Sequence, residues 1–545
     1  MTKKRTVQIV AFAILLVLLS GLLVACGGEK VAQYSETTDN YRTFYQIFPY
    51  SFADSDGDGV GDLQGIIAKL DYIKELNFDG IWLTPVHESP SYHKYDVIDY
   101  KSIDSKFGTM DDYDQLVEEC HKRGISIILD LVINHTSSEH VWFKRFTAAH
   151  NGNAGYKQYY DYYNWKSAPA GQSVDQPWYK VNNNKNLTWA YEGQFWSGMP
   201  DLNWGEVLEH PDGNLAQDLE EVIRYWLVDR KIDGFRLDAA HEFFSNDDDS
   251  SIEALKWVKE VATKYKPDVY IVGEGPWGSG AYDFYESGID FFLFSQGYAA
   301  HNNISMAARM EDVSYFTAID KENKKKIGSD GIPALFVANH DTPRAYGILQ
   351  GGVDVNNMKL GYGVMAMSAG TTYWYYGDEV GMNVFPKTPG DNESIIDEHK
   401  RQPMPWGDSY TCKPVFGTAN VADSIKYPYG DVATNLKDKN SLVNYIARAN
   451  ALRRAFPQIA RNYGTVVYMS DDDTYAIIQK GTGSDAIYIV ANLSHMFEAK
   501  IDLSTFDLGS VKLGGTLSVA VNSTPVLKGS GLTMPPMTFA VLQKV

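Results

Sequence analysis

Eight short apolar runs recur between residues 41 and 457, and amphipathic stretches of helical period lie between them. The runs are rich in β-branched and aromatic residues, as buried strands are. Strands that alternate with helices favour a parallel sheet, and eight of them favour an α/β fold closed into a (β/α)8 TIM barrel. The predicted strands are 44–48, 80–83, 125–132, 234–237, 269–273, 291–294, 334–338 and 372–375.

The alternation by itself also fits an open, doubly wound sheet with helices on both faces. The chain carries no glycine-rich fingerprint for phosphate binding that would support this alternative. The barrel is therefore the favoured architecture. A chain of 545 residues exceeds one ordinary domain, so further domains are expected beside the barrel.

Two segments interrupt the alternation. Residues 135–203 show no clear repeat and are too long for a plain loop, which predicts an inserted domain after the third strand. Residues 458–545 consist of alternating β-type runs, which predict a C-terminal antiparallel β-sandwich. The barrel would then be built from residues 41–134 and 204–457.

The N-terminus has the pattern of an export signal. Basic residues at 3–5 precede an apolar run at 7–24, which leads into Leu-Val-Ala-Cys ending at Cys26. This resembles a bacterial lipoprotein signal, in which residues 1–25 are removed, Cys26 is lipidated and residues 26–40 form a tether. The run is also long enough to span a membrane, so an uncleaved helix or an ordinary signal peptide stays an alternative. We expect an exported protein that is lipid-anchored to the bacterial cell membrane and faces outward.

The charge balance argues against a nucleic-acid partner. The chain has 69 acidic and 49 basic residues, a formal net charge of −20, whereas phosphate binding needs a concentrated positive field. Three cysteines cannot form a disulfide scaffold. Cys120 lies on an apolar helical stripe and is predicted to be a buried thiol. Whether it pairs with Cys412 is left open.

Acidic and other polar residues follow four of the predicted strands. In a barrel the C-terminal ends of the strands meet at one face, which carries the active site. A single acid there would fit a structural ion pair or a helix cap, but four such segments in order favour a functional site. The segments are 130–135, 234–241, 272–274 and 339–341.

In order and spacing these segments resemble the conserved regions of the α-amylase family of glycoside hydrolases. The resemblance extends over the barrel, the insertion and the C-terminal sandwich. Residues 199–203, Met-Pro-Asp-Leu-Asn, resemble the marker near the end of the inserted domain. In this form the marker is typical of α-amylases intermediate between the oligo-1,6-glucosidase and neopullulanase groups.

The resemblance implies three catalytic carboxyl groups. Asp238 would be the nucleophile, Glu274 the general acid/base, and Asp341 would hold sugar hydroxyls and favour the oxocarbenium-like state. A retaining glycosidase needs two carboxyl groups roughly 5–5.5 Å apart, one ionised and one protonated. Arg236 would keep Asp238 ionised, while partial burial and a neighbouring negative charge would raise the pKa of Glu274.

The resemblance also implies a set of substrate-binding residues. Two histidines would donate hydrogen bonds to the sugar at the cleavage point, and a tyrosine would stack on its ring. One arginine would hold the nucleophile, and another would steady the third carboxylate. A histidine outside such motifs is more often a capped or core residue. The implied set is Tyr95, His135, Arg236, His340 and Arg344.

The chain departs from the family pattern just after the nucleophile strand. Many α-amylases have Lys-His where this chain has His241-Glu242, so the family's leaving-group subsites cannot be copied in detail. Ala239 follows Asp238 at a position where specialists in α-1,6 bonds often carry Val. This favours α-1,4 linkages.

A run of acids and glycines from Asp54 to Asp62 predicts a calcium site. Acids at positions 1, 3, 5 and 9, a glycine (Gly59) at position 6 and a carbonyl at position 7 match loops that wrap oxygen ligands around Ca²⁺. Gly65 replaces the Glu of an EF-hand, so this is another type of loop, and family members have a calcium loop of this pattern. The alternative is a solvated acidic turn. The predicted ligands are Asp54, Asp56, Asp58, Val60 and Asp62.

Three functions fit the sequence. The first is an endo-acting α-amylase that cleaves α-1,4-glucan with retention. The second is a maltogenic, α-glucosidase-type or transglycosylating member of the same family. The third is a non-catalytic, surface glucan-binding lipoprotein, against which the intact acids at 238, 274 and 341 argue. The expected partners are an α-glucan and, through the lipid, the membrane. We expect a monomer. A second calcium site at Asn134 and Asp201, chloride dependence and product pattern stay open.

Overall fold

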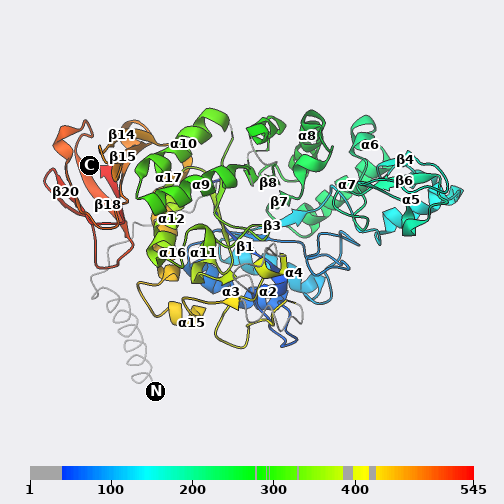
Figure 1. Ribbon diagram of the computed structural model, residues 1–545, viewed down its shortest axis with the longest axis horizontal. Coiled ribbons are helices and arrows are strands. Elements are labelled where there is room, and N and C mark those ends of the chain that lie inside the picture. Colours follow the sequence, from blue (N-terminus) through cyan, green and yellow to red (C-terminus); the bar gives the residue numbers. More distant parts are fainter. Residues whose placement is uncertain are drawn as a thin grey trace, which may run out of the picture.

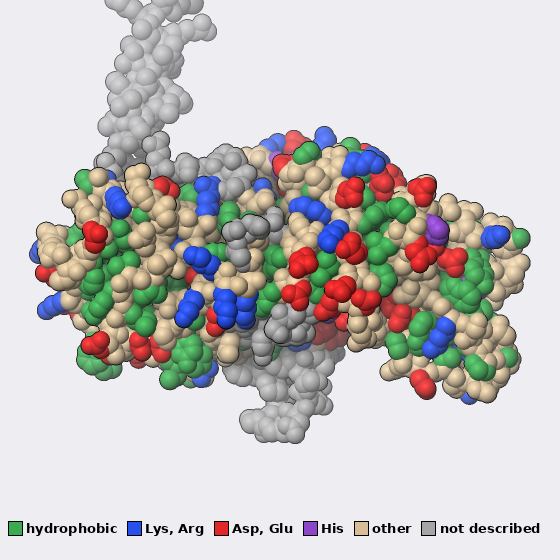
Figure 2. Space-filling model, turned by 90° about the horizontal axis from the view of Figure 1, so that it is seen from above, with side chains coloured by type: hydrophobic (Ala, Val, Ile, Leu, Met, Phe, Trp, Pro, Cys, Tyr) green, Lys and Arg blue, Asp and Glu red, His purple; other side chains and the backbone are tan. Residues whose placement is uncertain are grey.

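The computed structural model describes residues 40–275, 279–289, 291–293, 295–327, 331–384, 397–415 and 425–545. The proposed signal, Cys26 and nearly all of the tether lie outside these ranges. Among the described residues, no helix combines the length and the apolar character needed to cross a bilayer. Acidic and basic side chains are interspersed over the face seen in Figure 2.

An eight-stranded parallel sheet forms the centre of the molecule (Figure 1). Its hydrogen-bonded order is β10-β11-β1-β2-β3-β7-β8-β9, and the outermost strands β9 and β10 lie beside each other, so the sheet curls into a barrel. All eight strands coincide with predicted ones to within about three residues at either end, which confirms the (β/α)8 fold. The strands are β1 (Thr43–Ile47), β2 (Gly80–Leu83), β3 (Ser126–Leu131), β7 (Gly234–Leu237), β8 (Tyr270–Glu274), β9 (Phe291–Leu293), β10 (Ala334–Phe336) and β11 (Thr371–Tyr375).

Helices follow the barrel strands and bury their apolar faces against the sheet. In α4 the positions Tyr113, Leu116, Val117 and Cys120 are buried, as the helical spacing predicts. Thr109 starts this helix with a capping box, since it bonds the backbone of Asp112 and Asp112 bonds back. The long helices are α3 (Leu63–Glu75), α4 (Met110–Lys122), α7 (Asn214–Arg224), α8 (Asp248–Tyr265), α9 (Ser295–Met310), α10 (Val313–Ile327), α12 (Val355–Met367) and α16 (Leu442–Ala455).

Residues 135–203, in the connection between β3 and β7, form a separate unit at one end of the molecule, which we call the inserted unit (Figure 1). It contains α5 (Val141–His150) and a small antiparallel sheet in the order β4-β6-β5. Aromatic side chains fill its interior, as with Phe143, which packs edge-on against Tyr163 and Tyr191. The strands are β4 (Trp165–Ser167), β5 (Trp178–Tyr179) and β6 (Trp189–Glu192).

The opposite end of the molecule is all β (Figure 1). A five-stranded antiparallel sheet, in the order β14-β15-β16-β21-β18, packs on a three-stranded sheet, β17-β20-β19. A separate apolar cluster that includes Ile477, Val490 and Leu532 lies between them. This is the predicted β-sandwich. Its strands are β14 (Thr465–Met469), β15 (Tyr475–Lys480), β16 (Ile487–Asn492), β17 (Ala499–Asp502), β18 (Val511–Ser518), β19 (Val526–Lys528), β20 (Gly531–Met534) and β21 (Thr538–Lys544).

Short elements complete the described fold. Cys120 and Cys412 are both buried free thiols, so the two do not pair. The remaining short helices lie mainly in loops around the barrel. They are α2 (Pro49–Phe52), α6 (Trp204–Glu209), α11 (Ala345–Ile348), α13 (Asp397–Lys400), α15 (Val432–Asn435) and α17 (Gln458–Arg461), and a two-stranded ribbon joins β12 (Asn383–Val384) to β13 (Ile425–Lys426).

Candidate active site

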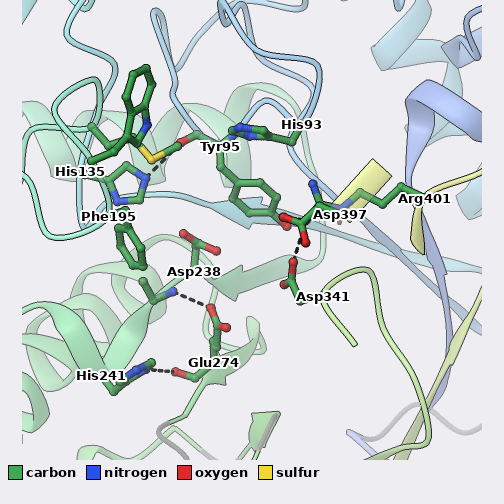
Figure 3. A pocket seen from close by; sticks show the side chains of 13 residues that line it. His93, Tyr95, His135, Phe195, Asp238, His241, Glu274, Asp341, Asp397 and Arg401 are labelled. Atoms are coloured by element: carbon green, nitrogen blue, oxygen red, sulfur yellow. Dashed lines mark hydrogen bonds and ion pairs between the residues drawn. The ribbon is translucent and has the colours of Figure 1, made fainter. Parts of the chain in front are cut away.

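A cavity of about 370 Å³ opens at the C-terminal ends of the barrel strands (Figure 3). The three predicted catalytic acids all line it. Asp238 follows β7, Glu274 is the last residue of β8, and Asp341 lies five residues beyond β10. Strand register explains the meeting of the first two, because Leu237 on β7 pairs with Gly273 on β8. The other lining residues are His93, Tyr95, His135, Phe195, Trp196, Met199, Ala239, His241, Asp397 and Arg401.

One buried guanidinium connects the acids of neighbouring strands. Arg236 Nη1 lies 2.6 Å from Asp238 Oδ1 and 2.7 Å from Asp130 Oδ1, and its Nη2 lies 2.8 Å from Glu274 Oε2. Burial raises the pKa of Asp238, and the charge of Arg236 opposes that shift. Arg236 does contact Asp238 as predicted, but in addition it holds two further carboxylates. Its contribution is therefore to compensate a cluster of negative charge.

Glu274 is placed for a role that needs a proton. Its Oε2 accepts a hydrogen bond of 2.9 Å from the backbone N–H of Ala239 as well as the bond from Arg236. Burial raises the pKa of Glu274, the charge of Arg236 lowers it, and the charges of Asp238 and Asp341 raise it again, so that the net shift is upward. The direction agrees with the sequence prediction, and burial is its largest cause.

Asp341 has the opposite electrostatic environment. Its Oδ1 lies 2.7 Å from Arg401 Nη2, and its Oδ2 lies 3.0 Å from His340 Nε2. Burial raises the pKa of Asp341, whereas the interactions with His340 and Arg401 lower it, and the balance lies well below the ordinary value. Asp341 is therefore ionised over the whole range in which Glu274 titrates.

A chain of hydrogen bonds orients the groups beside Asp341. Gln46 Nε2 donates to His340 Nδ1 at 2.7 Å, which leaves the ring proton on Nε2. That nitrogen lies 2.6 Å from the Tyr95 hydroxyl, which in turn donates to Asp130 Oδ2 at 3.0 Å. Burial lowers the pKa of His340, so the ring is neutral near pH 7 and Nε2 is a donor.

Of the three predicted sugar-contacting residues Tyr95, His135 and His340, two line the cavity and His340 lies behind them. Tyr95 and His135 line the cavity, and His135 Nε2 lies 3.2 Å from the Tyr95 carbonyl oxygen. Burial lowers the pKa of His135 to about 4, so its ring is neutral. His340 is buried just behind Tyr95, with the two rings stacked at a centroid distance of 5.4 Å.

Arg344 does not contact Asp341, which corrects the prediction that it steadies the third carboxylate. Its guanidinium donates to the Tyr376 carbonyl and lies 3.4 Å from Asp378 Oδ1. The arginine at Asp341 is Arg401, at the end of α13. Arg344 points away because it begins the short helix α11 and packs its guanidinium over Tyr375, 4.0 Å from the ring centroid.

Several cavity residues carry no sequence signal of their own. Arg401 lies 60 positions after Asp341 in a polar segment without a recognisable motif. Phe195 and Trp196 belong to the irregular segment before the marker at 199–203, and each side chain is 51% exposed. Two adjacent aromatic residues beside that marker are the one signal that could have indicated them.

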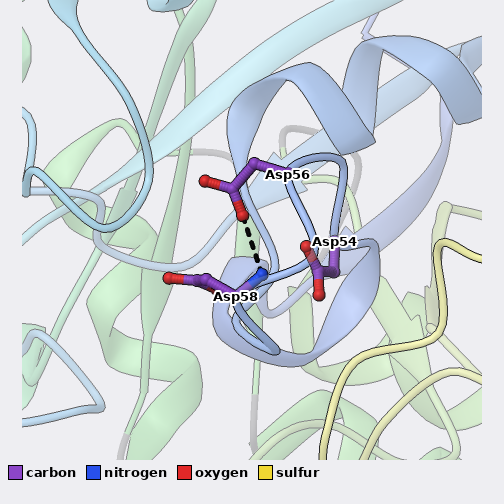
Figure 4. Close-up of side chains that lie close together, drawn as sticks. All are labelled: Asp54, Asp56 and Asp58. Atoms are coloured by element: carbon purple, nitrogen blue, oxygen red, sulfur yellow. Dashed lines mark hydrogen bonds between the residues drawn. The ribbon is translucent and has the colours of Figure 1, made fainter.

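The acidic loop after β1 brings three of its predicted ligands together (Figure 4). Carboxylate oxygens of Asp54, Asp56 and Asp58 lie within 4.8 Å of one another. Asp62 caps α3 instead, since it accepts bonds from Gly65 N and from the backbone and hydroxyl of Ser55. Three converging oxygens fit a hard cation such as Ca²⁺.

The second candidate metal pair is already bonded internally. Asn134 Nδ2 lies 3.4 Å from Asp201 Oδ1, and Asp201 Oδ2 accepts from Gln194 N at 2.8 Å. Burial raises the pKa of Asp201 to about 8. Asp201 therefore serves the inserted unit as a hydrogen-bonded anchor for the loop that carries Phe195 and Trp196.

Comparison with known proteins agrees with this geometry. The model of the α-amylase catalytic domain matches residues 46–462. The chain belongs to the α-amylase family.

Relatives of this α-amylase family member cover most of its length. α-Amylase 3 of Dictyoglomus thermophilum is 35% identical over 429 residues, which is 77% of this chain and 78% of that protein. Oligo-1,6-glucosidase of Parageobacillus thermoglucosidasius is 30% identical over 530 residues, with 83% and 89% covered. The structure of Eubacterium rectale Amy13B has a TM-score of 0.81 at 31% identity, and 94% and 97% of the two chains are covered. The protein is thus a glycoside hydrolase that acts on α-glucans.

Proposed function

We propose that the protein is an endo-acting α-amylase that cleaves α-1,4 bonds of starch and maltodextrins with retention of configuration. The observation that carries this proposal is the meeting of Asp238, Glu274 and Asp341 in one cavity with opposite electrostatic settings. Glu274, with its raised pKa, can hold the proton that the leaving group needs, whereas Asp341, with its lowered pKa, stays ionised beside it. The relative named α-amylase supports the same substrate.

In the first step, Asp238 attacks C1 of the sugar, and the bond from C1 to the leaving oxygen breaks. Glu274 gives its proton to that oxygen, so the leaving chain departs as an alcohol. The ionised Asp341 accepts hydrogen bonds from sugar hydroxyls while positive charge develops on the ring. The neutral ring of His135 binds the same sugar, and the neutral ring of His340 orients Tyr95 and Asp341 beside it.

In the second step, Glu274 is ionised and takes a proton from water. The water oxygen attacks C1 as its proton passes to Glu274, and the bond from C1 to Asp238 breaks, so that Glu274 is again protonated and Asp238 again ionised. Arg236 contacts both groups, so it compensates the negative charge that moves between them. Two inversions at C1 give net retention.

Azide rescue tests the two assignments. We expect Asp238→Ala to abolish turnover while oligosaccharide binding survives. Glu274→Ala should lose most activity on starch, whose leaving group needs protonation, and much less on an activated aryl α-glycoside. Added azide should then give an α-glycosyl azide, because it attacks the glycosyl-enzyme without a base. A β-glycosyl azide, or full starch activity in either variant, would refute the assignment.

The product pattern distinguishes the second candidate, an exo-acting, transglycosylating or α-1,6-cleaving enzyme. That candidate is supported by the relatives named oligo-1,6-glucosidase. Ala239 and the half-exposed Phe195 and Trp196 at the cavity support endo cleavage of α-1,4 chains. We expect iodine staining of amylose to fall before much reducing sugar appears, and panose to be a poor substrate. Early release of glucose or maltose alone would favour the second candidate.

Two further proposals concern metal and location. Asp54, Asp56 and Asp58 would hold Ca²⁺ through their carboxylates, and Val60 would add its backbone carbonyl. Asp62 would support the loop as the N-cap of α3. The ion would neutralise the acids and fix the loop. The N-terminal sequence supports export and lipid attachment at Cys26.

A further inference from the structure

A second pocket, of about 350 Å³, lies at the N-terminal ends of the barrel strands, whereas the catalytic cavity lies at their C-terminal ends. Tyr41, Pro333 and Gly370 line it, and these residues come just before β1, β10 and β11. Among its described lining residues, the charged ones are Lys324, near the end of α10, and Arg461, at the end of α17. We call this space the basal pocket.

The described chain begins at the basal pocket. Asn40 is its first residue, and the Thr371 hydroxyl at the start of β11 donates to the Asn40 carbonyl at 3.1 Å. Asn40 comes 14 residues after Cys26, so a lipid on Cys26 would lie at most about 50 Å along the chain from this point. A lipid anchor would therefore attach the protein through the side of the barrel that carries the basal pocket, which we call the basal side.

Positive charge gathers beside the basal pocket, although the whole chain carries a net charge of −20. Residues 321–326 contain four lysines and one acid. Lys321, Lys324 and Lys325 are exposed and have helical spacing, so they share one face of α10. Arg461 is exposed too and lines the basal pocket together with Lys324. An anionic membrane attracts such a cluster within about 10 Å at 0.1 M salt and repels the acidic remainder of the protein.

Strand β14 adds exposed apolar side chains to the same side. Its first residue, Thr465, lines the basal pocket, and the strand packs beside α10 (Figure 1). Val466 and Val467 are 44% and 36% exposed, although β14 is an edge strand, where apolar surface invites association. In Figure 2 a group of Lys and Arg side chains lies next to hydrophobic side chains at the sandwich end of the molecule.

The occupant that fits this surface is an anionic bilayer rather than a second copy of the chain. The pairing of β14 with β15 shifts in register between Val466 and Tyr468, and such a bulge disfavours the addition of another strand. Cations next to apolar side chains match the headgroup region of a bilayer, where phosphates lie above acyl chains. The point at which the tether enters the barrel is a further reason, because it brings this surface to the membrane.

We propose that this surface docks on the membrane that holds the lipid anchor. We call it the docking face, and it consists of Lys321, Lys324, Lys325, Arg461, Val466 and Val467. The proposal rests on lipid attachment at Cys26 and not on the reaction that the protein catalyses. Docking through the basal side holds the catalytic cavity away from the bilayer, so that polysaccharide outside the cell can enter it.

Quenching by spin-labelled lipid headgroups tests docking. The lipidated full chain carrying Val467→Cys would be labelled with a fluorophore, since Cys120 and Cys412 are buried and Cys26 would bear the lipid. It would be inserted into vesicles of phosphatidylcholine with and without phosphatidylglycerol. We expect strong quenching only with phosphatidylglycerol, and its reversal at about 0.5 M salt, which screens the attraction but leaves the lipid inserted.

Charge reversal identifies the residues that dock. Lys321→Glu, Lys324→Glu and Lys325→Glu, made together, should weaken docking about 100-fold or more. The matched control changes the net charge equally at exposed positions of the inserted unit, through Lys144→Glu, Lys157→Glu and Lys185→Glu. The control should leave the quenching unchanged, and melting curves should confirm that all variants fold.

Three outcomes would overturn the proposal. The first is equal quenching in the two triple variants, or no quenching on phosphatidylglycerol vesicles that hold the lipidated protein. The second is an emission shift that appears in detergent micelles and grows with protein concentration, which would assign the face to a second copy. The third is native protein whose Cys26 carries no lipid by mass spectrometry, which would refute the anchoring as well. Starch hydrolysis measured in detergent recognises a failure of the proposed amylase function separately.

Discussion

Replacing Glu379 by Gln should change how the stability of the protein depends on pH. Glu379 lies in a short 3-10 turn, Asp378–Val380, after β11 and is 2% exposed. Its Oε1 accepts bonds from the hydroxyls of Tyr45 at 2.5 Å and Tyr72 at 2.9 Å. Burial raises its pKa, the two tyrosine bonds lower it and the charge of Asp378 raises it, so that the pKa moves from 4.5 to about 7.

The sign and size follow from proton linkage. Between pH 4.5 and 7 the folded protein holds a proton on Glu379 that the unfolded chain has released, so the free energy of unfolding falls as pH rises. At 1.36 kcal/mol per pKa unit, the loss between pH 5 and pH 8 is about 2.5 kcal/mol. Gln does not titrate, and its carbonyl oxygen can still accept from both tyrosines. The variant should therefore lack this loss.

Urea unfolding at pH 5 and pH 8 measures the effect. The difference in unfolding free energy between native and Glu379→Gln proteins should shift by about 2.5 kcal/mol in favour of the variant at the higher pH. Glu260→Gln, an exposed position on α8, is the control and should show no such shift. The same difference at both pH values would mean that Glu379 does not carry a raised pKa, and the reasoning would be refuted.

Three other perturbations give distinct outcomes. Arg401→Leu should lower kcat/KM about 100-fold or more, because Asp341 loses its ion-pair partner. The pKa of Asp341 should then rise, so the acidic limb of the pH–rate profile should shift to higher pH; an unmoved limb would contradict this. Chelation, or Asp56→Ala, should lower the melting temperature but leave the specific activity at low temperature much less affected, since an ion at a hundredfold excess over Kd stabilises the folded state by about 2.7 kcal/mol. A melting curve unchanged after verified metal removal would argue against a calcium site in this loop. Cys26→Ser should shift activity from the membrane fraction to the medium or trap the precursor, and native protein found free of lipid would exclude anchoring.

The barrel could be predicted because each strand is a short apolar run buried by helices on one side and by the core on the other. Runs such as Gly80–Leu83 and Gly234–Leu237 appear in the structure with the same bounds. The predicted ends are less accurate where a strand runs into the active site, since Val337 and Ala338 are buried but have left the ladder of β10. The hydrophobicity of a residue indicates that it is buried, but it does not indicate where the hydrogen-bonded ladder of the strand ends.

Asp238, Glu274 and Asp341 were predictable because they lie at or just after the ends of strands, and strand order fixes where strand ends meet. Arg401 was not, because its position depends on a long connection after β11 that returns to the barrel face. The resemblance to the family favoured Arg344, because it matches a position that steadies the third carboxylate there. Helix α11 begins at that point and directs Arg344 toward Tyr376 and Asp378 instead.

Asp130 belongs to a segment that resembles a conserved region of the family, and it shows that an acid in such a segment need not touch substrate. It is fully buried and does not line the cavity, yet its carboxylate binds Arg236 through Oδ1 and accepts from Tyr95 and Trp82 through Oδ2. Burial raises its pKa to about 7 against the lowering effect of Arg236. Because Arg236 also binds Asp238 and Glu274, any change in the charge of Asp130 alters the field at both. Asp130 is thus a positioning residue, and the pH dependence of the reaction belongs to this connected group rather than to one acid.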